Sequence, residues 1–71
     1  MMPLGMANVG DAGTIQKITG RDEVRQHLAE LGFVVGERVT VVNKMGGNLI
    51  CAVKDSRIAL SQAMAMRVMV S

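Results

Sequence analysis

Only one stretch of this sequence has the residue spacing of an amphipathic helix. Val24, Leu28 and Leu31 follow one another at intervals of four and three residues, which places them on one face at 3.6 residues per turn. Elsewhere eight glycines divide the 71-residue chain into short pieces, and glycine interrupts both helices and strands. The sequence therefore predicts one α-helix, near residues 21–32, among elements that are all short.

Both ends of this helix carry sequence signals. Thr19 is of a residue type that caps helix starts, and Asp22 follows three positions later in a box-like arrangement. At the other end Gly32 stands where a left-handed residue closes a Schellman motif. Phe33 would then contact Leu28 in the last turn, as such endings usually do. We expect the helix to stop at Gly32.

The other segments are rich in β-branched residues and predict short strands. Ile15 and Ile18 are three residues apart, which breaks strict alternation and indicates a bulge in the first strand. The pair Gly46–Gly47 suits a hairpin tip, because primed turns need residues that accept positive φ. Ser61 would cap a single helical turn over residues 61–65. The five strands are expected at residues 14–18, 38–44, 48–53, 57–60 and 67–70.

These elements fit one small domain over residues 1–71, because single domains usually need about 50–200 residues. Five strands and one helix predict a fold that is mainly β. A sheet of this size has two exposed edges through which it can aggregate, and closing the sheet removes them. We therefore expect a small closed β-barrel.

Charge and composition argue against several classes of function. The net charge is only +2 and Phe33 is the one aromatic residue, so the chain lacks the basic surface and the stacking rings of a nucleic-acid binder. The longest apolar run, Leu49 to Val53, is far shorter than the roughly 20 residues of a membrane-spanning helix. The single Cys51 excludes an intramolecular disulfide and fits a reducing compartment. These features predict a cytoplasmic protein without nucleic-acid partner or membrane insertion.

Nothing in the sequence pairs a nucleophile with a base. His27, the only histidine, lies on the predicted helix, whereas Cys51 lies in the middle of a predicted strand. Because nucleophilic catalysis needs the two side by side, this pattern favours a protein that is not an enzyme. Seven methionines are more than a chain of this length usually has, and they favour an adaptable contact surface over a copper site, which generally needs more than one thiolate.

One cluster on the predicted helix has the residue types of a metal site. Glu23, His27 and Glu30 are four and three residues apart, so they form one stripe beside the apolar face. Two carboxylates and an imidazole suit a divalent first-row metal, bound weakly or with help from a second chain. A solvated helix face produces the same pattern, and both interpretations stay open.

Two stretches resemble a known family. The segment from Arg25 to Glu37 resembles the motif RxxLxELGxxPGxxV of the ferrous iron transport protein A (FeoA) family, with Val35 where that family commonly has proline. The segment from Asp55 to Ser61 is similar to the family's RIAL-type strand. Pro3-Leu4 and Val9-Gly10 match its usual start, so the resemblance spans nearly the whole chain.

The resemblance implies an SH3-like β-barrel and a role in bacterial ferrous iron uptake. It implies a cytoplasmic, non-catalytic accessory to the permease FeoB, which has a cytosolic GTPase domain and would be the protein partner. The alternative is a metal-binding or metal-sensing domain like the C-terminal barrel of DtxR-type repressors. No cofactor is required by the first function, and weak self-association is left open.

The predicted helix and the loop after it are where we expect a partner to bind. Leu28 is the predicted anchor, Arg25 the polar contact at its rim, and Leu31 and Phe33 complete the surface. Leu28 is equally suited to be a core residue. Measuring both partner binding and thermal unfolding of Leu28→Gln is needed to separate the two.

Overall fold

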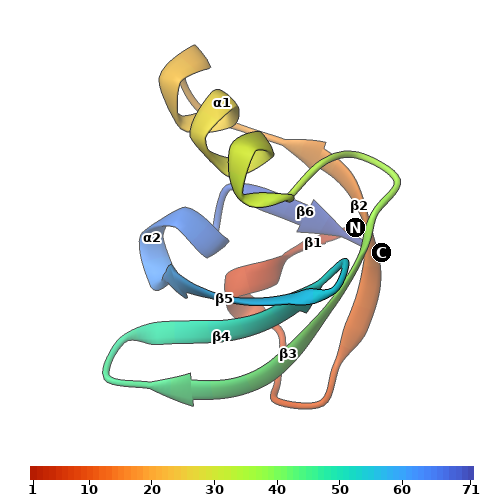
Figure 1. Ribbon diagram of the computed structural model, residues 1–71, viewed down its shortest axis with the longest axis vertical. Coiled ribbons are helices and arrows are strands. Elements are labelled where there is room, and N and C mark those ends of the chain that lie inside the picture. The colour runs from red at the N-terminus through yellow and green to blue at the C-terminus, as the bar shows by residue number, and fades with distance from the viewer.

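The computed structural model describes all 71 residues as six strands and one main helix, with two shorter helical turns (Figure 1). The strands are β1 (Met2–Pro3), β2 (Ala12–Ile18), β3 (Arg38–Met45), β4 (Asn48–Val53), β5 (Ser56–Ser61) and β6 (Val68–Val70). The helical elements are the 3-10 turn η1 (Leu4–Met6), α1 (Asp22–Leu31) and α2 (Gln62–Ala65).

All strand pairs are antiparallel, in the order β1-β6-β2-β3-β4-β5. Strands β3, β4 and β5 form a local meander, whereas β6 returns from the end of the chain to lie between β1 and β2. The predicted fold class, mainly β with one helix, is confirmed. The predicted count of five strands is one short, because the two-residue β1 is too brief to show an alternating pattern.

The sheet curls into a barrel-like shape but does not close, which corrects the predicted closed barrel. Strand β5 leads into α2 and strand β1 leads into η1, and these two helical turns pack together between the two edges (Figure 1). The Gln62 side-chain amide donates a hydrogen bond to the Gly5 carbonyl, with 2.7 Å between Nε2 and O. Helical turns therefore cover the gap that a strand pair would have sealed.

The core lies inside the curl of the sheet and contains no buried polar side chain. Buried side chains alternate along β3 and β4, as expected for strands with one face inward. Phe33, just after α1, is the largest of the fully buried side chains. The core consists of Leu4, Ala7, Ile15, Leu28, Phe33, Val39, Val41, Leu49, Cys51, Val53, Leu60, Ala65, Val68 and Val70.

Helix α1 ends as predicted and begins differently. Gly32 has φ of 108°, and its N–H donates to the Ala29 carbonyl, with 3.0 Å between N and O. The Phe33 N–H donates to the Leu28 carbonyl at 2.9 Å, which completes the Schellman pattern. The predicted cap Thr19 does not cap the helix: its N–H and its hydroxyl both donate to the Arg67 carbonyl. That pairing with the segment before β6 is long-range and leaves no local sequence signal.

The predicted turns are confirmed. Gly46 and Gly47 have φ of 53° and 82°, the two positive values that a primed hairpin turn requires. The pairing of β2 with β6 shifts register between Ile15 and Lys17, where the sequence predicts a bulge. The Ser61 hydroxyl oxygen accepts a hydrogen bond from the Met64 N–H at 3.2 Å and so caps α2.

Candidate functional site

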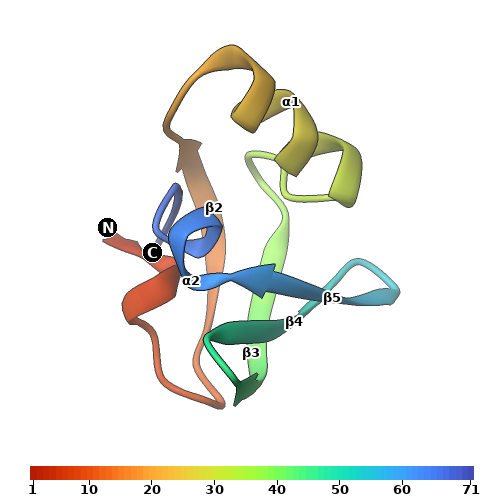
Figure 2. The ribbon, with the colours of Figure 1, turned by 90° about the vertical axis from the view of Figure 1, so that its left-hand side faces the viewer.

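Helix α1 lies at one end of the molecule, beyond the end of β2 (Figures 1 and 2). It attaches to the core through the predicted apolar stripe. Leu28 belongs to the core, and the partly buried Val24 and Leu31 pack against it. The opposite side of the helix is exposed to solvent. The helix is thus held along one face and free along the rest.

Two of the four predicted partner-contact residues are not on the surface. The side chains of Leu28 and Phe33 are 0% exposed, because the Schellman turn folds Phe33 back into the core beside the last turn of α1. Leu28 is therefore a core residue of the domain, which corrects its expected place on the contact surface. Leu31 is half-buried, and the side chain of Arg25 is 52% exposed. The loop after the helix adds the exposed Val35.

The charged residues of α1 fall on two different flanks. At 3.6 residues per turn, Arg25 lies about 100° from Val24 on one side of the buried stripe, and Glu23 lies about 100° on the other. Arg25 forms an ion pair with Asp22 on its own flank. His27 lies on the flank of Glu23. A partner that contacts Arg25 therefore meets a different surface from one that contacts the acidic stripe.

The predicted metal stripe does not form a metal centre within one chain. Glu23, His27 and Glu30 are all exposed, and no group of three metal-ligating side chains is close enough to hold an ion anywhere in the chain. Glu23 and Glu30 are seven residues apart, about 10 Å along the helix axis, whereas metal–ligand bonds are about 2 Å long. At most two neighbouring members of the stripe can share an ion.

No nucleophile–base pair exists in the folded chain. Cys51 is fully buried in β4, whereas His27 is exposed on α1. Burial raises the pKa of the Cys51 thiol to about 11, so at neutral pH it is an uncharged core residue. A neutral buried thiol neither attacks a substrate nor ligates a metal.

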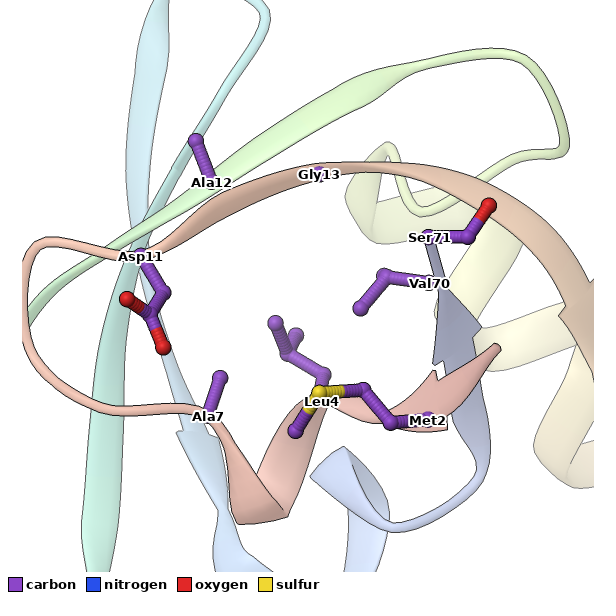
Figure 3. A pocket seen from close by; sticks show the side chains of 8 residues that line it. All are labelled: Met2, Leu4, Ala7, Asp11, Ala12, Gly13, Val70 and Ser71. Atoms are coloured by element: carbon purple, nitrogen blue, oxygen red, sulfur yellow. The ribbon is translucent and has the colours of Figure 1, made fainter.

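The structure contains a pocket that the sequence analysis missed. It has a volume of about 160 Å³ and lies near the two chain ends (Figure 3). Leu4, Ala7 and Val70 direct apolar side chains into it, and the Asp11 carboxylate points into it from one end (Figure 3). Its lining residues are Met2, Leu4, Ala7, Asp11, Ala12, Gly13, Val70 and Ser71.

Long-range pairings assemble this pocket. Met2 pairs with Val70 across β1 and β6, and Thr14 exchanges two backbone hydrogen bonds with Ser71, at 2.9 and 3.1 Å. The turn before β2 is held by hydrogen bonds to Val41 of β3. Since these partners are up to about 70 positions apart in the sequence, no local spacing brings them together. The one local signal is the run of small residues at the start of β2.

The profile of the FeoA domain family matches residues 2–71. This chain belongs to the FeoA family. The family and a relative named as an Fe(2+) transport protein place this chain in ferrous iron transport, as the sequence resemblance predicts. No helix of the structure has the length and apolar character that crossing a membrane requires.

Several relatives support this assignment. The chain is 31% identical over 70 residues to a protein of Methanocaldococcus jannaschii named for Fe(2+) transport protein A, covering 99% of this chain and 85% of that protein. A crystal structure of FeoA, described as an iron uptake regulatory protein, has a TM-score of 0.91 and 34% identity, over 99% of this chain and 93% of that one.

The fold is also that of a structure with a known ligand. FeoA of Stenotrophomonas maltophilia in complex with zinc, described as an SH3 domain protein, has a TM-score of 0.81 and 32% identity, over 100% of this chain and 91% of that one. The predicted SH3-like fold is thereby confirmed. A manganese-dependent transcriptional repressor has a TM-score of 0.88 at 21% identity, over 96% of this chain and 39% of that one. That likeness shows the fold alone.

Proposed function

We propose that this chain is a cytoplasmic, non-catalytic docking module for the cytosolic part of a FeoB-type ferrous iron permease. The observation that carries this proposal is the FeoA family match over residues 2–71. It takes in every element of the fold, from β1 to β6. In this proposal the surface of the domain itself carries the contacts with the permease.

The chemistry of the chain supports docking rather than catalysis. Its only cysteine is buried and neutral, its only histidine is exposed without a neighbouring nucleophile, and no buried polar side chain is present. Nucleophilic catalysis needs a nucleophile and a base held side by side, and the fold keeps the buried Cys51 apart from the exposed His27. A domain of this kind acts by what its surface contacts.

The surface offers room for one partner. A standard interface buries about 800 Å² on each side, roughly a fifth of the 4211 Å² exposed by this domain. The end of the molecule formed by α1 and its following loop projects from the sheet (Figure 2). There Arg25 is a charged group, and Leu31 and Val35 supply apolar area beside it. Arginine beside partly exposed aliphatic residues is a composition typical of protein contacts.

The direct test is binding to the purified cytosolic domain of a FeoB-type permease, measured by calorimetry. We expect the wild-type chain to bind the permease domain. Arg25→Glu should bind about tenfold more weakly, because it reverses the charge of a contact in the interface. Glu30→Lys is the matched control, since it reverses a charge of α1 on the flank opposite Arg25. Equal binding by Arg25→Glu and the wild type removes α1 from the interface, and no binding by any variant overturns the docking function.

A second candidate function is direct binding of a divalent metal. The zinc complex of the Stenotrophomonas maltophilia FeoA, 32% identical to this chain, is the observation that favours it. In this chain Glu23 and His27, or His27 and Glu30, are the neighbouring pairs at helical spacing that suit such an ion. Metal titration of the isolated domain separates this function from docking alone.

A further inference from the structure

The pocket at the chain ends has the size and lining of a receptor for one side chain. Its volume of about 160 Å³ matches that of an engineered apolar cavity of about 150 Å³ that binds a single benzene. Leu4, Ala7 and Val70 belong to the core, so the floor of the pocket is fixed in place. A rigid apolar floor that opens to solvent favours an aliphatic side chain from outside.

One charged group faces this apolar space. The Asp11 carboxylate accepts a hydrogen bond from the Asn8 N–H, with 2.9 Å between Oδ2 and N. It has no ion-pair partner, since the only ion pair of the chain joins Arg25 and Asp22. Figure 3 shows the carboxylate directed inward beside Ala7. The pocket therefore complements an apolar group accompanied by a positive charge, and it repels anionic ligands such as fatty acids.

A strand edge borders the same space. Just before β2 the backbone carbonyl of Asp11 accepts from the Val41 N–H of β3, and within β2 the Ile15 N–H donates to the Glu37 carbonyl, both at 2.9 Å. Thr14 instead bonds to Ser71 on the opposite edge. Because backbone groups alternate between the two edges of a strand, the N–H and carbonyl of Ala12 face the same edge as those of Thr14. That edge borders the pocket, so an extended chain placed there can add to the sheet.

We propose that the pocket binds an extended segment of a partner protein, with an aliphatic side chain in the pocket and a lysine or arginine two residues away against Asp11. Residues two apart lie on the same side of a strand, about 7 Å apart, so both enter the same face of the site. This inference rests on the proposed docking function and names the kind of segment that is docked. It adds a contact at the chain ends to the one proposed on α1.

The test is an NMR titration of the isotope-labelled chain with the capped pentapeptide Thr-Leu-Thr-Lys-Thr. We expect the amide signals of Leu4, Ala12, Gly13 and Val70 to shift. Replacing the peptide lysine by glutamate, or its leucine by alanine, is expected to abolish these shifts. Equal responses to the lysine and glutamate peptides, or shifts confined to other residues, overturn the inference. Equally tight binding of hexylamine overturns it in favour of a site for small amphiphilic cations.

Variants of the chain sharpen the test. Asp11→Asn keeps an oxygen for the Asn8 N–H but removes the charge, and we expect about threefold weaker peptide binding, as for a solvent-exposed ion pair. Asp55→Asn makes the same charge change in the turn between β4 and β5, on the far side of the molecule from the chain ends (Figure 2), and is expected to leave binding unchanged. Equal effects of the two substitutions contradict a specific role for Asp11.

A substitution that fills the pocket tests this inference separately from the docking function. Ala7 points into the pocket (Figure 3), so Ala7→Leu occupies the space intended for the partner. Loss of both peptide and permease binding by a folded Ala7→Leu, checked by its thermal unfolding, supports the inference. Permease binding equal to that of the wild type overturns it and leaves the docking function in place. If even the wild type fails to bind the permease, the docking function is wrong, and the peptide titration alone decides on the pocket.

Discussion

The end of the molecule that carries α1 and the end that carries the pocket are built in opposite ways. The α1 end comes from one continuous segment, whose cap, stripe and turn lie within residues 21–36. The pocket end is assembled from β1, η1, the start of β2 and the end of β6 (Figure 3). The first can change its surface by substitutions within one short segment. The second depends on pairings between the two ends of the chain.

Both ends nevertheless rest on the same core. Leu28 and Phe33 join α1 to it, and Leu4 and Val70 form the pocket floor from it. A disturbance of the core therefore affects both candidate binding surfaces, whereas a disturbance of the outer residues affects one. Substitutions at the two ends test whether this division is real.

The largest effect is expected for Leu28→Gln. Leu28 is completely buried, so the substitution places an amide without a hydrogen-bond partner in the core. We expect a loss of about 3–5 kcal/mol in the free energy of unfolding. A domain of this size is stable by only roughly 4–11 kcal/mol, so the variant should be largely unfolded in mild urea, as measured by circular dichroism.

Arg25→Gln is the control for this prediction, because it changes an exposed residue of the same helix and should cost less than about 0.5 kcal/mol. A Leu28→Gln protein that keeps its stability but loses binding to the permease would restore Leu28 as a partner anchor. That result would mean that α1 moves away from the core in solution.

The same contrast explains what could be predicted from the sequence. The stripe of Val24, Leu28 and Leu31, the ending at Gly32 and the hairpin at Gly46–Gly47 depend on residues only a few positions apart, and all were predicted. Thr19 was misassigned because its hydrogen bonds go to Arg67, 48 positions away. The closed barrel was wrong because the packing of α2 on η1 is also long-range.

The candidate site was harder to predict than the fold. Helical periodicity identifies which residues share a face, and Arg25 was correctly expected on the surface. It cannot tell whether an apolar residue such as Leu28 faces the core or a partner, because both environments select the same side chains. The pocket around Asp11 was missed altogether, since its walls meet only when β6 is placed beside β2.

The second largest effect is expected at Gly32, where the backbone conformation and not the space is limiting. Gly32 has φ of 108°, and a Cβ there would lie 3.6 Å from the nearest atom, Cγ1 of Val53. We expect Gly32→Val to lose about 1–3 kcal/mol through backbone strain. Gly32→Ala should lose most of that amount in the same urea titration. An alanine variant as stable as the wild type would contradict the strain argument.

A smaller effect is expected at Gly13, in the wall of the pocket, and for a different reason. Its φ is not in the left-handed region, but a Cβ would lie 3.1 Å from the Ser71 carbonyl oxygen and 3.3 Å from Cβ of Val70. We expect Gly13→Val to lose about 1–2 kcal/mol by overpacking the contact between β2 and β6. Gly13→Ala should lose clearly less, in contrast to Gly32→Ala. Equal losses for the two Gly13 variants would show that crowding is not the cause.

The smallest effect on stability is expected for His27→Ala, which tests the acidic flank of α1. The side chain of His27 is exposed and makes no hydrogen bond, so the free energy of unfolding should change by less than about 0.5 kcal/mol. The effect of His27→Ala that matters here is the effect on metal binding. Since at most two members of the stripe can share an ion, we expect Zn²⁺ or Fe²⁺ to bind weakly, and His27→Ala to remove that binding in calorimetry.

The pH dependence of this binding provides the independent check. A metal takes the neutral imidazole, so protons compete with the ion and its occupancy should fall on acidification. Glu37→Gln, which removes a carboxylate outside α1, serves as the control and should leave the heat unchanged. Equal heats for the wild type and His27→Ala would show that the stripe is a solvated helix face. In that case the α1 end is left with Arg25 and its flank as the surface on which a partner can act.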